Sequence, residues 1–116
     1  LAINRTLARD HQAAEFGLAA VVRFDPVDMK VHAQLQGDEP ALTHEILRMQ
    51  LPHPTLADLD YSIILEKHGY GSYLGKLPTL AASNWHLLIE SEPQDWRLTA
   101  RVDLPRETSI RLGHMQ

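Results

Sequence analysis

The chain contains no cysteine among its 116 residues. This absence excludes a disulfide-stabilised scaffold, a thiol nucleophile, and every zinc or iron–sulfur site that depends on cysteine ligands. The sequence also lacks an uninterrupted apolar run of about 18 residues, the length that indicates a membrane-spanning helix. Basic residues are in the minority, because 11 Lys and Arg stand against 15 Asp and Glu. Nucleic-acid-binding domains usually carry a basic surface, so nucleic acid is not expected as a partner.

The remaining composition is that of an ordinary globular protein. Hydrophobic residues make up 44% of the chain and charged residues 22%, which is not the composition of a disordered segment. The length fits one domain, which can bury about two thirds of its unfolded surface. The first residue is Leu1 and not Met, and we interpret it as a cut or processed end.

Residues 1–16 are predicted to form a helix. They are rich in Ala, Leu, Arg, Gln and Glu and contain neither Gly nor Pro, a composition that favours helix. Gly17 follows directly and is placed to end the helix as its first non-helical residue. The apolar stripe of this segment is narrow, so we expect a helix that docks lightly or that continues a longer helix upstream.

After Gly17 the hydrophobic residues recur with a period of two, which is typical of half-buried strands. Residues 42–51 have the composition of a helix but the alternation of a strand, and the neighbouring segments favour a strand. We predict a mainly β fold, an antiparallel β-sandwich of about seven strands after an N-terminal helix. The predicted strands are residues 18–24, 29–36, 42–51, 60–66, 70–77, 84–90 and 96–104.

The chain is expected to divide into three parts: a membrane-proximal helix at residues 1–17, the β-sandwich domain at 18–105, and a polar C-terminal tail at 106–116. The two tryptophans, Trp85 and Trp96, lie in adjacent predicted strands of the sandwich. Large aromatic side chains in such positions are expected to anchor the core. The alternative is an exposed anchor for a binding partner.

The most distinctive local motif is a histidine between two prolines. Pro52 and Pro54 hold His53 on a rigid, extended loop, and Thr55 and Asp60 follow. The imidazole could be presented to a metal or to a partner protein. It could instead bond a backbone group and fix the turn, with Thr55 and Asp60 closing it, which is the commoner role of polar turn residues.

Copper is the metal to consider, because seven histidines and three methionines supply the imidazole and thioether groups that suit Cu(I). In an extended segment, Met49, Leu51 and His53 point to the same side. Met49 and His53 are therefore a candidate pair of metal ligands, although no recognised ligand spacing accompanies them. A buried methionine more often fills the core. We expect no resident cofactor, with copper on this pair as the alternative.

Catalytic machinery is difficult to assemble from the sequence. The carboxylate pairs Asp58 with Asp60 and Glu90 with Glu92 lie beside turns, where such pairs are usually solvated or cap the turn. No serine has the GxSxG context of a nucleophile. The glycines at 69 and 71 lack the strand–helix context of a phosphate-binding loop. We expect a protein that is not an enzyme.

Four stretches occur in a recognisable order. They are LAIN at 1–4 before a polar helix that ends at Gly17, LPHPT at 51–55 before Asp60, GSY at 71–73 before Leu77 and NWHL at 84–87, and DWRL at 95–98 before Arg101. In this order and spacing they resemble the periplasmic domain of FixH-type proteins, also called CcoH. The resemblance covers the chain up to about residue 104.

The resemblance implies an inner-membrane protein with a single transmembrane helix and an immunoglobulin-like domain in the periplasm. FixH-type proteins are encoded with a copper-transporting P-type ATPase and assist assembly of the cbb3-type cytochrome c oxidase. The expected partners are therefore cbb3 oxidase subunits or that ATPase, with a membrane helix upstream of Leu1. The implied function is assembly or maturation of the oxidase through protein–protein contacts. The alternatives are a copper-handling periplasmic module that uses Met49 and His53, and a ligand-binding sandwich, for which no specific feature is present.

Overall fold

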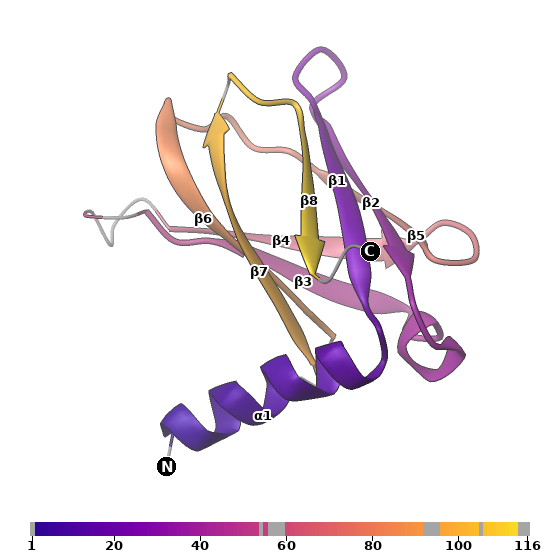
Figure 1. Cartoon of the computed structure of the whole chain (residues 1–116). Coiled ribbons are helices and arrows are strands. Elements are labelled where there is room, and N and C mark those ends of the chain that lie inside the picture. Colours follow the sequence, from indigo (N-terminus) through magenta and orange to yellow (C-terminus); the bar gives the residue numbers. More distant parts are fainter. Residues whose placement is uncertain (1, 54, 56–59, 92–95, 105, 114–116) are drawn as a thin grey trace.

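The structure, a computed structural model of the chain, describes residues 2–53, 55, 60–91, 96–104 and 106–113 (Figure 1). Within these residues, one α-helix and one 3-10 turn accompany eight strands. The elements in chain order are α1 (Ala2–Glu15), β1 (Ala19–Asp25), β2 (Lys30–Gln36), the 3-10 turn (Glu39–Leu42), β3 (Ile46–Leu51), β4 (Tyr61–Lys67), β5 (Ser72–Lys76), β6 (Ser83–Ser91), β7 (Arg97–Leu104) and β8 (Ser109–Gly113).

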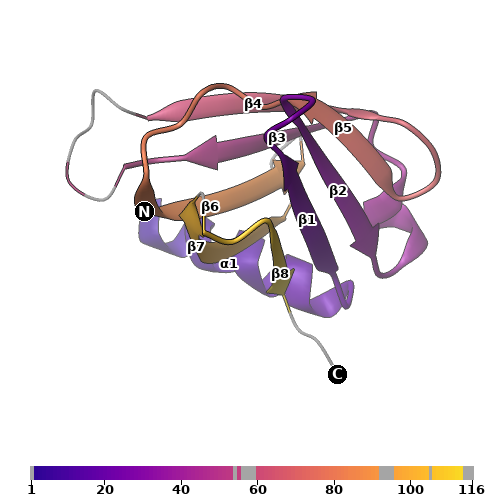
Figure 2. The ribbon, with the colours of Figure 1, turned by 90° about the horizontal axis from the view of Figure 1, so that it is seen from above.

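The strands form one antiparallel sheet in the order β7-β6-β3-β4-β5-β2-β1-β8. Strand β3 pairs with β4 along its whole length, whereas β4 pairs with β5 only through Glu66 with Leu74 and Lys67 with Tyr73. This short ladder lets the sheet bend into two four-stranded halves. In Figure 1, β1, β2 and β8 stand upright while β3 and β4 lie across them. The outermost strands β7 and β8 also approach each other, so the sheet curves nearly into a barrel (Figure 2).

The predicted mainly β, antiparallel fold with an N-terminal helix is confirmed, and the ambiguous segment 42–51 is resolved. Leu42 ends the 3-10 turn, and the strand begins at Ile46. Its burial alternates from residue to residue, as expected where one face of a strand packs on the core. The neighbouring strands β4 and β6 supply backbone partners on both sides, which a helix in this position could not use.

The expectation of a polar tail after residue 105 is wrong for residues 109–113. These residues form β8, which pairs with β1 from Ser109 opposite Arg23 to Gly113 opposite Ala19. The side chain that secures β8 is Leu112, which is 1% exposed. Gly113 permits the close approach, since its φ is +88° and an added Cβ would collide with the carbonyl oxygen of Leu18. Residues 109–113 contain only two apolar residues, so the alternation typical of a strand is weak in this part of the sequence.

The hydrophobic core lies between the two halves of the sheet. It is built mainly from the inward-facing residues of the strands, together with Ala13 of α1, Ala41 and Leu42 of the 3-10 turn, and Leu18 and Trp96 next to strands. Trp85 and Trp96 are both fully buried in it. The largest fully buried side chains are Trp85, Trp96, Tyr73, Leu18, Leu35, Leu47, Met49, Leu51, Leu65, Leu87, Ile89 and Leu112.

Helix α1 lies across the lower end of the sheet and packs against β7 (Figure 1). Gly17 ends the helix as predicted, with φ of +63°. The N–H of Gly17 donates to the carbonyl of Ala14, and the N–H of Leu18 donates to that of Ala13, which satisfies carbonyls that the helix end would leave unpaired. In the described part of the chain, no helix has the length and apolar character needed to cross a bilayer.

Tyr73 on β5 links the two halves, because its hydroxyl donates to the carbonyl oxygen of His44 at 2.5 Å. Burial, and to a lesser extent the negative charge of Glu45, raises the pKa of the Tyr73 phenol above its ordinary value of 10.0. The folded state therefore holds this proton more tightly than the unfolded state. The resulting stabilisation is complete below the unfolded-state pKa and is lost as the pH rises through the folded-state pKa.

Tyr73→Phe is accordingly expected to lower the free energy of unfolding by about 1 kcal/mol at neutral pH, because the His44 carbonyl loses its donor. The same variant should lose less stability than the parent between neutral and strongly alkaline pH. Urea denaturation of both proteins at the two pH values measures this. The same alkaline loss in both proteins would contradict the assignment to Tyr73.

Candidate functional site

The loop between β3 and β4 contains the histidine that lies between two prolines. The backbone N–H of His53 donates to Oδ1 of Asp60 at 2.9 Å, and Nδ1 of His53 accepts from the N–H of Thr55 at 3.2 Å. A neutral imidazole that accepts at Nδ1 carries its proton on Nε2. Pro54 lies outside the described residues. Thr55 and Asp60 thus close the turn around His53 by bonding its imidazole and its backbone.

The imidazole of His53 also packs on the core through Trp85. The two rings meet edge to face, with centroids 4.9 Å apart and an interplanar angle of 90°. Tyr61 contributes a second tilted contact with the indole, at 5.7 Å and 70°. The indole Nε1 of Trp85 donates to the carbonyl of Ala81 at 3.0 Å. Trp85 therefore connects the His53 loop, the start of β4 and the segment before β6.

Met49, the other half of the candidate metal pair, lies in the core. Its side chain is 0% exposed, and its strand neighbours are Ile63 and Ile89. A copper ion would reach the thioether only by opening packed apolar side chains, and Nδ1 of His53 already accepts a hydrogen bond. Within the described residues, no group of three or more His, Cys, Asp or Glu side chains is placed to hold a metal ion. Copper binding by this pair stays a prediction.

Trp96 belongs to a different part of the core. It is 0% exposed, and its ring centroid lies 6.4 Å from that of His44, with the planes tilted by 51°. Its indole Nε1 finds no hydrogen-bond partner within the part of the chain that the structure describes. Trp85 and Trp96 are thus equally buried but differ in hydrogen bonding.

The sequence interpretation missed the contacts of Glu90 with Arg9 and Gln50. The position of Glu90 beside a turn predicts a solvated carboxylate, yet the residue is only 5% exposed. Its Oε2 accepts from Nη1 of Arg9 at 2.6 Å, and its Oε1 accepts from Nε2 of Gln50 at 2.9 Å. The sheet register also places Arg48 and Arg97 directly opposite Glu90 on the two neighbouring strands. No local sequence pattern could reveal a pair separated by 81 residues.

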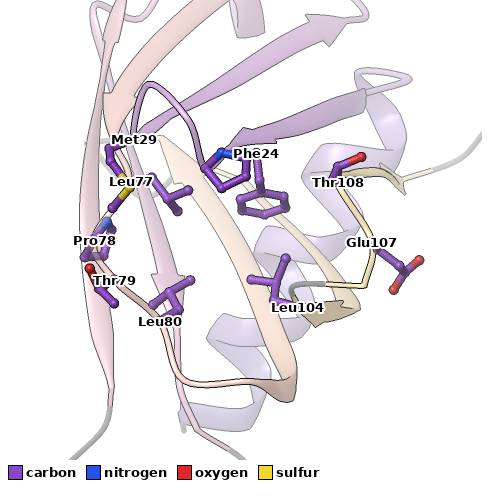
Figure 3. Close-up of a pocket in the computed structure, with 10 residues that line it drawn as sticks. Phe24, Met29, Leu77, Pro78, Thr79, Leu80, Leu104, Glu107 and Thr108 are labelled. Carbon is purple, nitrogen blue, oxygen red and sulfur yellow. The ribbon is translucent and has the colours of Figure 1, made fainter.

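An apolar hollow of about 210 Å³ is lined by residues of the β1–β2 turn, of the segment after β5 and of the end of β7. Figure 3 shows side chains converging on it from three segments, with Phe24 from β1, Leu77 from just after β5 and Leu104 from β7. Met29 at its rim has φ of +55°, a backbone conformation uncommon outside glycine. The turn that carries Met29 is built by Asp25, whose Oδ1 accepts from two backbone N–H groups.

A family model described as FixH matches residues 1–103, which is most of the chain. The chain belongs to the FixH family. The resemblance inferred from the four ordered stretches is therefore confirmed. No curated protein and no solved structure matches the chain. The FixH match includes α1, the His53 loop and both tryptophans, and it stops before β8.

Asp60→Ala tests how the His53 loop is held in this FixH domain. The change removes the acceptor for the N–H of His53, and we expect it to lower the free energy of unfolding by about 1 kcal/mol or less, since the bond is exposed. Urea denaturation measures the loss. Asp60→Asn keeps a side-chain oxygen and should recover most of the stability. Equal losses in the two variants would show that this hydrogen bond does not hold the loop.

Proposed function

We propose that this FixH-family chain is the periplasmic domain of a single-pass inner-membrane protein that assists assembly of cbb3-type cytochrome c oxidase. The observation that carries the proposal is the FixH match over residues 1–103, because FixH proteins are generally linked to this oxidase. The domain acts by binding other proteins and not by catalysis. Its proposed partners are subunits of the oxidase or the copper-transporting P-type ATPase.

The arrangement of the elements suits a tethered binding domain. Helix α1 lies at one end of the sheet, and the turn between β1 and β2 projects from the other (Figure 1). A membrane anchor joined to the α1 end would leave this turn and the apolar hollow directed away from the bilayer. Val27 at the turn is 88% exposed, so its apolar surface is available to a partner.

Removal of the gene tests the proposal in the source cell. We expect a fall in cbb3 oxidase activity and in assembled oxidase, measured with a cytochrome c oxidation assay and native gel electrophoresis of membranes. Reintroduction of the full-length gene should restore both. The control variant is Arg111→Gln, which changes an exposed residue of β8 outside the FixH match and should restore activity fully. Normal oxidase levels without the gene would reject the assembly role.

Copurification tests the mechanism of association. Epitope-tagged full-length protein, extracted from membranes with mild detergent, is expected to carry oxidase subunits or the copper-transporting ATPase. An identically tagged, unrelated single-pass protein serves as the control. Recovery of neither partner, under conditions in which the oxidase is being assembled, would count against assembly by direct contact.

The copper-handling alternative has its own test. Titration of Cu(I) into the 116-residue chain, in competition with a chromogenic chelator, would detect a site that uses Met49 and His53. The combined change Met49→Leu and His53→Ala should abolish binding if the alternative holds. Binding that is absent, or that survives the double change, would eliminate this pair as ligands.

A further inference from the structure

A groove opens between β4 and β5 where their pairing stops. The β4–β5 ladder contains only Glu66 with Leu74 and Lys67 with Tyr73. The pairing does not continue to Leu65 and Gly75, which would be the next opposite residues. The hollow beside this point has a volume of about 850 Å³. Its apolar walls include Ile64 of β4, which is 47% exposed, and Leu77 and Pro78 after β5.

The backbone of β4 directs hydrogen-bonding groups into this groove. The N–H of Lys67 points to the β3 side, where it donates to the carbonyl of Glu45 at 2.9 Å. Because backbone groups alternate in direction along a strand, those of Ser62 and Ile64 point to the opposite side. At Ile64 this side is covered by β5, since a Cβ added to Gly75 would lie only 2.8 Å from the Ile64 carbonyl oxygen, so the open edge of β4 is at Ser62.

The chain after β5 does not close the groove. The N–H of Leu77 donates to the carbonyl of Met29 at 3.0 Å. This N–H is therefore directed toward β2 and away from the groove. Pro78 comes next and has no N–H to offer. The edge of β4 around Ser62 therefore faces a hollow and not a neighbouring strand of the described chain.

Two lysine side chains line this groove at positions where their like charges lower the stability of the fold. Lys30 and Lys76 are directly opposite each other in the register of β2 and β5, and both line the hollow. Like charges in such a cross-strand pair are destabilising. Glu66 is the single carboxylate among the residues that line the hollow, although the whole chain carries a net charge of −4.

We propose that this groove binds an extended, acidic segment of a partner protein, which adds to the edge of β4 as a further strand. The backbone of β4 around Ser62 would supply main-chain hydrogen bonds, which are the source of affinity in strand addition. Lys30 and Lys76 would select acidic side chains by charge. This groove would be a binding surface for the role proposed above, so the inference rests on the proposed function.

A second copy of this chain fits the groove poorly. Pairing of two β4 edges would bring the lysine pair of one copy toward that of the other. Lysines at a sheet edge are a recognised means of preventing such edge-to-edge association. The same charges attract a segment of opposite sign, so the groove favours an acidic partner over self-association.

The test uses the 116-residue chain and a defined probe, a short capped peptide of alternating valine and threonine with an aspartate near each end. Titration followed by amide NMR is expected to shift the signals of Ser62, Ile64 and Lys76. The double change Lys30→Gln and Lys76→Gln should raise the Kd about fivefold at low salt. The matched control is Arg101→Gln with Arg106→Gln, which removes the same charge from exposed positions elsewhere and should leave the Kd unchanged.

Two further probes separate strand addition from other binding. The same peptide with alternate amides N-methylated cannot form the strand hydrogen bonds and should not shift these signals. A peptide with lysine in place of aspartate should bind more weakly than the acidic one. Equal binding of either probe, or no shifts with the acidic peptide, would overturn the proposal.

Analytical ultracentrifugation of the chain without peptide tests whether a second copy of the chain occupies the groove. A dimer that dissociates when Ser62 is replaced by Pro would assign the groove to a second copy and reject the acidic segment. None of these results depends on the oxidase. A negative peptide titration beside intact copurification would reject the groove alone, whereas loss of copurification with intact peptide binding would reject only the assembly role.

Discussion

Trp85→Ala is expected to lower the free energy of unfolding by about 4 kcal/mol, which is within the usual range for removal of a buried tryptophan. The side chain is 0% exposed. Its loss would leave a cavity and remove the ring contacts with His53 and Tyr61. Urea denaturation with constant slope measures the change. Because typical domains are stable by only about 5–15 kcal/mol, the variant should also fail to restore oxidase assembly in cells.

Phenylalanine variants separate the packing contribution of the indole from its hydrogen bond. Trp85→Phe removes ring volume and also the N–H that donates to the Ala81 carbonyl at 3.0 Å. Trp96→Phe removes a similar volume, but its N–H has no partner among the described residues. We expect Trp85→Phe to be more destabilising than Trp96→Phe by about 1 kcal/mol. The reverse order would show that packing differences outweigh this hydrogen bond.

Arg9→Met is expected to lower the free energy of unfolding by about 2 kcal/mol, because it removes the guanidinium that is paired with the Glu90 carboxylate at 2.6 Å. The side chain of Glu90 is 6% exposed and that of Arg9 is 24% exposed. The expected loss of unfolding free energy is therefore smaller than the loss expected for a fully buried ion pair. Methionine keeps most of the apolar length of arginine, so the change reports chiefly on the charge. Chemical denaturation again gives the value.

A double-mutant cycle tests whether Arg9 acts through Glu90. Glu90→Gln alone should destabilise the domain, whereas the combination with Arg9→Met should cost less than the two separate effects together. The expected coupling is about 1 kcal/mol. Additive effects would mean that the 2.6 Å contact contributes nothing specific to the docking of α1.

Prediction from sequence succeeded where the signal lies within one segment. The alternation of buried and exposed residues along β2 and β3 is visible in the sequence and reappears in the structure. The end of α1 at Gly17 was likewise predictable, since a glycine after a helical composition marks a terminus. These features depend on neighbours a few residues apart.

The candidate site was only partly predictable. The segment from Pro52 to Asp60 suggested a closed turn, and the structure supplies the bonds from Asp60 and Thr55 to His53. The sequence could not show that the imidazole packs on Trp85, which is 32 residues further along the chain. It also could not show that Glu90 is buried beside Arg9, since the strand alternation predicts only that the Glu90 side chain lies on the face opposite Trp85.

The sequence alone was enough to predict a cysteine-free, mainly β domain with an N-terminal helix, and its ordered motifs indicated the FixH family. The structure was needed to show that β8 pairs with β1, that Arg9 contacts Glu90, and that the β4–β5 ladder ends after two pairs. The physical reason is the range of the interactions. Local periodicity states which face of a strand is buried, whereas strand order and register arise from contacts between distant residues that form only together.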